Sequence, residues 1–74
     1  MPAKQRPLDV LQRSLNARVI VEMRVGREYR GVLDGFDPHL NVVLRNAEEV
    51  IYGNVARTFP VAIVRGDNVV FISP

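Results

Sequence analysis

Apolar residues near the N-terminus follow a helical period. They recur at intervals of three and four positions, at Leu8, Leu11 and Leu15. Residues with this spacing share one side of an α-helix. Pro7 suits the first helical turn, and Asn16 tolerates the left-handed conformation that ends a helix. The spacing therefore predicts a helix over residues 7–16, preceded by a flexible, basic arm over residues 1–6.

After Asn16 the period of the apolar positions changes from about 3.6 to about 2. Every second residue of the next segment is apolar, at Val19, Val21, Met23 and Val25. This alternation predicts a strand with one apolar face, and Gly26 predicts a tight hairpin after it. The following strand, over residues 28–36, contains Gly31 and Gly35. Because glycine inside a strand marks sharp bending or close backbone approach, this strand should bend as a small barrel requires.

The middle of the chain has weaker signals. A short third strand is predicted over residues 42–45, and the polar residues 46–49 favour a turn. Gly53 lies between two short apolar runs, so residues 46–60 are predicted to form a variable loop that contains a hairpin. Pro60 carries no amide hydrogen, which favours an edge strand or a bulge at that position.

The last two predicted strands carry apolar residues on both faces. They span residues 61–64 and 68–72. A chain of 74 residues has no further material to cover both faces, and so small a core rarely supplies more than about 3–5 kcal/mol of net stability. No cysteine is present for a disulfide, and one histidine with scattered carboxylates indicates no metal site. Edge-to-edge pairing with another copy is the expected solution, and such a head-to-tail contact gives a closed ring if the rotation between copies closes.

The charge balance adds a candidate partner. Nine of the ten basic residues are arginine, set against eight acidic residues. Arginine favours planar, bidentate contacts, which points towards RNA, although a genomic or thermal preference for arginine explains the same composition. No apolar run approaches the ~20 residues of a membrane span, and the N-terminus lacks the apolar core of a signal peptide. A cytoplasmic protein without membrane contact or cofactor is expected.

Two polar segments between predicted strands carry the candidate binding chemistry. The first is residues 37–41 and the second is residues 65–68. A pocket for a flat base needs planar groups on both faces and one side chain that both donates and accepts hydrogen bonds. His39 and Arg65 can sandwich the ring, and the Asn41 amide can bond to the edge of a uracil. These segments therefore predict a nucleobase pocket, provided that the fold brings them together.

The remaining residues of the two loops have supporting roles in this hypothesis. Asp37 is expected to cap its turn, and Gly66 to let the backbone approach the base. Asp67 is a candidate for orienting Arg65 or Asn41. Each loop also has an ordinary explanation, because an exposed histidine, a turn-capping asparagine and an Arg-Gly-Asp-Asn hairpin turn are all common.

A second, weaker RNA contact is predicted near the helix. Arg6 and Arg13 supply positive charge there, and Phe36 supplies an aromatic face. Phe36 also fits the hydrophobic core, and the two arginines also fit a solvated surface. Both interpretations stay open at the level of the sequence.

The spacing of residues in both halves of the chain resembles a known family. The first group is Gly31, Leu33, Asp37, Asn41 and Leu44, and the second is Ile63, Arg65, Gly66, Val69 and Ile72. These groups look like the two sequence motifs of archaeal Sm-like (LSm) proteins, and the resemblance extends over nearly the whole chain. The first motif lies within residues 18–45 and the second within residues 61–73, in a single domain over residues 1–74.

The resemblance implies both a fold and a function. The fold would be mainly β, a short N-terminal helix followed by a strongly bent, five-stranded antiparallel barrel of SH3-like shape. Sm-like proteins pair their fourth and fifth strands between neighbours, so the resemblance implies a ring of about six or seven copies, with seven favoured. In that family the positions of His39, Asn41 and Arg65 line a uridine pocket. The resemblance thus implies binding of uridine-rich single-stranded RNA, as a scaffold or chaperone that works with RNA-processing proteins.

Two other classes of function fit the sequence less well. A protein-interaction module built on the same barrel needs an exposed aromatic groove, but the chain has no tryptophan and its few aromatic residues are needed in the core. An enzyme is disfavoured because His39 has no partner residue, and Ser14 and Ser73 lack the surroundings of a nucleophile. The bacterial branch of the Sm-like superfamily is also disfavoured, because its second motif contains a Tyr-Lys-His signature that is absent here.

Overall fold

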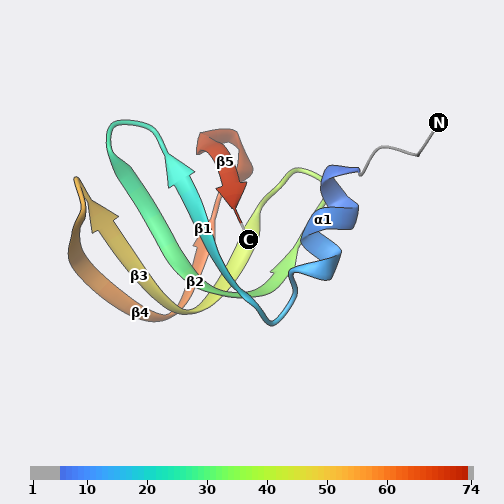
Figure 1. Ribbon diagram of the computed structural model, residues 1–74, viewed down its shortest axis with the longest axis horizontal. Helices are drawn as coiled ribbons and strands as arrows, with labels where there is room; N and C mark the ends of the chain where they lie inside the picture. The colour runs from blue at the N-terminus through green and yellow to red at the C-terminus, as the bar shows by residue number, and fades with distance from the viewer. Residues whose placement is uncertain (1–5, 74) are drawn as a thin grey trace.

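The computed structural model describes residues 6–73, which form one short helix and one five-stranded sheet (Figure 1). The helix α1 spans Pro7–Arg13, and a 3₁₀ turn, η1, spans Gly66–Asn68. The strands are β1 Arg18–Met23, β2 Arg27–Phe36, β3 Val42–Ile51, β4 Asn54–Val64 and β5 Val69–Ser73. The predicted basic arm, apart from Arg6, lies outside the described residues. Within residues 6–73, no helix has the length and apolar character needed to cross a membrane.

All paired strands run antiparallel, in the order β4-β3-β2-β1-β5. Strands β1 to β4 pair in sequence order, and β5 returns to pair with β1. The long strands curve strongly, so that the sheet wraps round on itself, and α1 lies at one end beside the loop between β2 and β3 (Figure 1). The predicted fold of a short helix and a bent antiparallel sheet is confirmed, and β4 and β5 are its two edge strands.

Two irregularities in the pairing of β2 with β3 accompany this curvature. The register shifts once at Gly31 and once just before Gly35, the two positions that the sequence marked as bending points. Gly31 is buried, and a Cβ atom added there would lie 3.0 Å from the carbonyl oxygen of Arg45. Even a methyl group would therefore press on the neighbouring strand, as the prediction of close backbone approach requires.

The hydrophobic core lies within the curve of the sheet. Its buried apolar side chains are Leu11, Val19, Val21, Leu33, Val42, Leu44, Ala47 and Val64. Leu11 and Leu15 of the predicted leucine stripe pack in or against this core, whereas Leu8 remains 38% exposed. Burial of the stripe holds in place a helix that is too short to persist alone.

The helix α1 ends at Arg13, before the predicted boundary at residue 16. The Ser14 hydroxyl donates a hydrogen bond to the Val10 carbonyl at 2.9 Å, and the chain then turns away from the helix axis. Asn16 adopts the predicted left-handed conformation, with a φ of 67°, and its amide donates to a carbonyl of β2. Asn16 thus has the left-handed conformation that the sequence predicted, but a turn separates this residue from the end of the helix.

The predicted polar turn over residues 46–49 is wrong. β3 continues through this segment and pairs with β2 on one side and β4 on the other. Asn46 bends the strand with a φ of 50°, whereas Ala47 and Glu49 are buried. The segment looked like a turn because three of its four residues are polar, but one of these polar residues is inside the protein.

The predicted variable loop over residues 46–60 is likewise wrong. The second half of β3 and the first half of β4 occupy this segment. The hairpin expected at Gly53 does exist, with a left-handed φ at both Tyr52 and Gly53, and it lies at the tip of β3 and β4. Pro60 lies within β4. Because β4 is an edge strand, the missing amide hydrogen of Pro60 is tolerated there, as predicted.

Candidate nucleic-acid interface

The two predicted binding loops meet in the structure. The first connects β2 to β3 over residues 37–41, and the second runs from Arg65 through η1. Oδ1 of Asn41 accepts a hydrogen bond from the backbone amide of Gly66 at 2.7 Å. This bond joins positions 25 residues apart, so the predicted meeting of the loops is confirmed.

Asp37 organises the first loop. Its Oδ1 accepts hydrogen bonds from the backbone amides of His39 and Asn41, at 2.9 and 3.1 Å. Its Oδ2 accepts a hydrogen bond from Nδ2 of Asn41 at 2.8 Å. The bond from the Asn41 side chain, with smaller contributions from the two amides, lowers the pKa of the Asp37 carboxyl group, because each bond favours its charged form. The predicted capping role is confirmed, and the carboxylate also orients Asn41, which the sequence did not predict.

The orientation of the Asn41 side-chain amide follows from its two partners. A carboxylate can only accept a hydrogen bond, and a backbone amide can only donate one. The nitrogen must therefore face Asp37 and the oxygen must face Gly66, since a flipped amide would lose both bonds. One N–H and one oxygen lone pair of the amide remain for a ligand. The side chain is thus held ready to donate to and accept from the edge of a flat ring.

Gly66 permits the close contact between the two loops. A Cβ atom added at this position would overlap with the carbonyl oxygen of His39. A larger residue would push the loops apart and break the hydrogen bond from Gly66 to Asn41. The sequence predicted that Gly66 makes room for a base, whereas in the structure the room is needed by the backbone of the neighbouring loop.

Arg65 and Asp67 lie beside each other at the surface. Nη2 of Arg65 is 3.3 Å from Oδ2 of Asp67, and both side chains are largely exposed. Such a pair adds little stability in water, but it restricts the directions in which the guanidinium group points. Asp67 therefore contacts Arg65, one of its two predicted targets, while Asp37 takes the other target, Asn41.

An open hollow of about 450 Å³ lies where the loops meet, and we call it the base hollow. Its lining consists of Gly35, Phe36, Asp37, Asn41, Val42, Val43, Ile63 and Arg65. The lining combines apolar side chains of three strands with the polar groups of Asn41 and Arg65. His39 and Asp67 lie on the same two loops with exposed side chains, outside this lining.

The three residues of the predicted second RNA contact come from the end of β2 and from the two ends of α1. Phe36 packs against the core and lines the base hollow. Arg6 lies at the start of α1, beside Pro38 and Leu40 of the first loop, and Arg13 is the last residue of the helix. A joint RNA contact of Phe36 with the helix arginines therefore stays a prediction, and Phe36 itself, at the end of β2, lines the base hollow.

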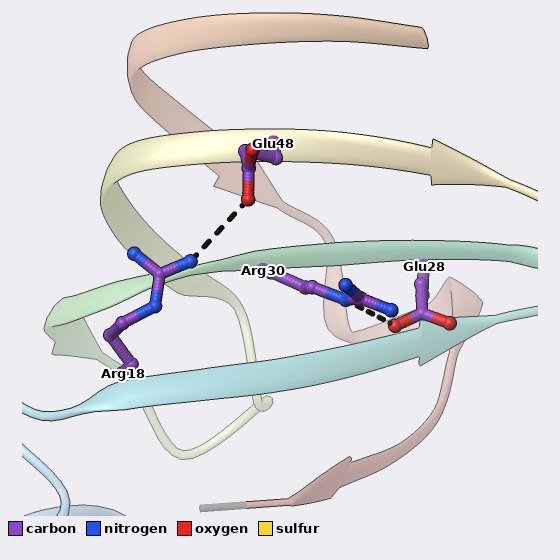
Figure 2. A network of polar contacts seen from close by, with 4 residues as sticks. All are labelled: Arg18, Glu28, Arg30 and Glu48. Carbon is purple, nitrogen blue, oxygen red and sulfur yellow. Dashed lines mark hydrogen bonds and ion pairs between the residues drawn. The ribbon is translucent and has the colours of Figure 1, made fainter. Parts of the chain in front are cut away.

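Arginines on the outer face of the sheet are paired with carboxylates. Figure 2 shows two such pairs, Arg18 with Glu48 at 3.4 Å and Arg30 with Glu28 at 2.9 Å. The arginine side chains in these pairs are substantially exposed, so each pair contributes at most ~1 kcal/mol. Each of these two arginines has a carboxylate beside it that offsets its positive charge towards an anionic partner.

Glu49 is a buried carboxylate of β3, and its partners come from the neighbouring strands β2 and β4. Tyr29 donates a hydrogen bond to its Oε2 at 2.8 Å, and Nε of Arg57 donates to its Oε1 at 3.0 Å. These two bonds, together with the charge of Arg57, lower the pKa of Glu49 despite its burial. Burial, and the hydrogen bond to the Glu49 carboxylate, raise the pKa of Tyr29. Within residues 6–73, Glu49 belongs to no cluster of three or more metal-ligating side chains.

Comparisons with known proteins agree with this geometry. The sequence matches the model of the LSM domain over residues 9–74. A protein of Archaeoglobus fulgidus described as snRNP Sm-like is 56% identical over 69 residues, which cover 93% of this chain and 90% of that protein. The structure of a Pyrococcus abyssi Sm protein in complex with a uridine heptamer has a TM-score of 0.91 at 50% identity, covering 95% of this chain and 99% of the other. A heptameric Sm protein of P. aerophilum has a TM-score of 0.87 at 43% identity, covering 97% and 96% of the two chains.

Proposed function

Because the chain belongs to the Sm-like (LSm) family, we propose that it binds uridine-rich single-stranded RNA as a ring of identical subunits. The observation that carries the proposal is the Asn41 amide, which Asp37 and Gly66 hold in one orientation beside Arg65. It is supported by the related Sm protein of P. abyssi, whose structure contains a uridine heptamer.

Uracil fits the groups that the Asn41 amide leaves free. The edge of uracil carries carbonyl acceptors next to one N–H donor, so the amide donates to a carbonyl and accepts from the ring N–H. Arg65, which lines the base hollow, stacks on one face of the base, and His39, exposed on the first loop beside the hollow, covers the other face. Cytosine presents an amino donor and a bare ring nitrogen at the same edge, which would leave polar groups mispaired. In this proposal Asn41 sets the preference for uridine, and the stacking residues supply affinity.

The ring follows from the two edge strands. Val61 and Ile63 of β4 are 58% and 74% exposed, and Val70 of β5 is 60% exposed. Within residues 6–73, β4 pairs only with β3 and β5 only with β1, so each strand leaves one edge free. Pairing β4 of one copy with β5 of the next would cover these side chains and repeat head to tail until the ring closes. We expect seven subunits, the number in the heptameric P. aerophilum relative.

The ring would act as a cytoplasmic, non-catalytic scaffold or chaperone in RNA processing or turnover. Each subunit carries one base hollow, so a single RNA strand can occupy several hollows at once. Repeated occupancy converts weak binding at each hollow into tight binding of the whole strand. A scaffold for uridine-rich RNA requires both features: each hollow selects the base, and the hollow is repeated in every subunit of the ring.

Fluorescence anisotropy with short uridine and cytidine oligomers tests the proposal. The wild-type ring should bind the uridine oligomer more tightly, and Asn41→Ala should narrow the gap between the two oligomers. Arg65→Ala should weaken both in parallel, by about 1–3 kcal/mol per stacked base. Arg18→Ala removes an exposed arginine of the outer face and should bind like the wild type.

Native mass spectrometry on each variant must show an intact ring, because Asn41 also holds the second loop in place. The proposal is contradicted if the intact wild-type ring binds uridine and cytidine oligomers equally well. If Asn41→Ala instead keeps the full uridine preference, RNA binding stands and only the edge contact assigned to Asn41 is withdrawn.

A further inference from the structure

A second hollow adjoins the base hollow and is lined by three arginines; we call it the arginine hollow. Arg24 and Arg27 flank the turn between β1 and β2, and Arg65 comes from the second binding loop. Ile63 and Arg65 line both hollows, so the two are adjacent at that point. The arginine hollow has a volume of about 440 Å³, and none of the described residues that line it is acidic.

Arg24 differs in its surroundings from the arginines of the outer face. The outer arginines each lie within 3.4 Å of a carboxylate, and they are Arg18, Arg30 and Arg45 (the first two in Figure 2). Among residues 6–73, by contrast, Arg24 forms no ion pair and its side chain is exposed. Its charge is therefore available to an anionic ligand.

Arg27 is only weakly neutralised. Its Nε lies 3.9 Å from Oε2 of Glu49, and that carboxylate already accepts shorter hydrogen bonds from Tyr29 and Arg57. The Arg27 side chain is about half exposed, so its remaining N–H groups can reach a ligand. Arg24 and Arg27 thus both line a hollow whose described lining contains no acidic residue.

The turn that carries both arginines is fixed in position. Val25 and Gly26 both have a left-handed φ, of 62° and 67°, as a two-residue hairpin turn requires. The carbonyl oxygen of Gly26 accepts a hydrogen bond from the amide of Tyr52 at 2.8 Å, which ties the turn to the tip of β3 and β4. The backbone positions of Arg24 and Arg27 are therefore set before a ligand arrives, and only their side chains need to adjust.

We propose that the arginine hollow binds the phosphodiester backbone of the RNA strand whose base occupies the base hollow. This inference rests on the proposed function, because it assigns a path to that strand. Arg65 lines both hollows, so a strand whose base lies beside Arg65 can bring a neighbouring phosphate to Arg24 and Arg27. Guanidinium groups bind phosphate oxygens through charge-assisted, bidentate hydrogen bonds. Such contacts fix the position of a strand but carry no base preference.

The salt dependence of binding separates this role from that of the base hollow. Arg24→Gln and Arg18→Gln remove the same charge from two exposed positions. For a single strand, each lost phosphate contact should lower the slope of log K against log salt by about 0.7 in magnitude. For Arg24→Gln we expect this decrease in slope and a Kd raised about threefold or more at low salt, whereas Arg18→Gln should match the wild type in both. The uridine preference should be unchanged in both variants. Equal salt slopes for Arg24→Gln, Arg18→Gln and the wild type would overturn the inference.

Arginine modification in the wild-type ring gives a second test that needs no variant. Phenylglyoxal reacts with exposed guanidinium groups, and the modified positions can be mapped by mass spectrometry. A uridine oligomer should protect both Arg65 and Arg24, whereas the nucleoside uridine, which has no phosphate, should protect Arg65 alone. Arg18 should react equally in every sample and serves as the control.

The two tests distinguish failure of the inference from failure of the proposed function. Protection of Arg65 by the oligomer without protection of Arg24 would overturn the inference and leave the base hollow in place. Protection of neither arginine would contradict the proposed function itself. If Arg24→Gln fails to assemble, the pattern of protection in the wild-type ring still decides between these outcomes.

Discussion

One asparagine side chain both holds a loop and faces the candidate ligand. Asn41 uses one N–H on Asp37 and one lone pair on Gly66, and its second N–H and second lone pair remain free. A side chain fixed in this way loses little conformational freedom when a base binds, so less of the binding free energy is offset by ordering. The specificity of the site therefore depends on the loop contacts as much as on Asn41 itself.

The contact between the loops can be tested at Gly66. Gly66→Ala places a methyl group against the His39 carbonyl oxygen, so we expect a loss of about 1–3 kcal/mol in unfolding free energy and weaker oligouridine binding. Gly35→Ala is the matched control, because a Cβ atom there meets no atom within 4 Å. Its unfolding free energy should stay within about 0.5 kcal/mol of the wild type. Chemical denaturation that ranked the two variants equally would contradict the close approach of the loops.

Some of these residue-level features could be predicted from the sequence and others could not. The two loops were identifiable because Asp-Pro and Arg-Gly-Asp-Asn interrupt runs of alternating apolar residues. The bond from the Asn41 side chain to Asp37 depends on how the chain folds back, including a left-handed φ of 62° at Leu40. A leucine gives no sequence signal for that conformation, so the orienting role of Asp37 became visible only in the structure.

Among the secondary-structure elements, the pairing of β2, β3 and β4 was the part least accessible from the sequence. Glu49 of β3 bonds to Tyr29 of β2 and Arg57 of β4, so its partners lie on two other strands. A buried carboxylate whose partners are distant in sequence looks locally like a solvated turn residue. The glycine bends at Gly31 and Gly35, by contrast, were predictable because the signal lies in the residue itself.

The pH dependence of stability should report on Glu49. Its pKa in the folded chain is lowered relative to the unfolded chain, so the stabilisation is present above about pH 4.3 and is lost as the pH falls through the folded-state pKa. Glu49→Gln should therefore be less stable than the wild type at pH 7 and lose less of its stability between neutral and acid pH. Glu28→Gln, which alters an ion pair on the outer face of the sheet, is the control and should follow the wild-type pH profile. Chemical denaturation at a series of pH values measures this. If the unfolding free energy of all three proteins changed with pH in the same way, the stabilising role of the Glu49 carboxylate would be contradicted.

For the whole molecule, the free edges of β4 and β5 decide the state in solution. Apolar side chains on exposed edge strands favour association with another chain, and natural proteins cover or pair such edges. The sequence predicted this because both last strands are apolar on both faces, although it could not give the number of subunits. That number depends on the angle between neighbouring copies, which no local pattern records.

A charge placed on one edge should therefore prevent assembly. Val70→Lys introduces a lysine into β5, where pairing with β4 of the next copy would bury it, so we expect the ring to dissociate. Val25→Lys adds the same charge in the β1–β2 turn, at a side chain that is 81% exposed, and should leave the ring intact. Light scattering or native mass spectrometry measures the difference. A Val70→Lys ring of unchanged mass would mean that β5 is not an assembly edge.

The short turn η1 leads from β4 to β5, and its first residue, Gly66, is the one bonded to Asn41. In the proposed ring these two strands face different neighbours, so the segment that follows Arg65 of the base hollow also connects the two subunit contacts. Occupancy and assembly are then thermodynamically coupled: RNA that rigidifies this segment strengthens the contact between subunits, and assembled subunits bind RNA more tightly by the same factor. The ring would consequently resist dilution better with RNA bound than without it.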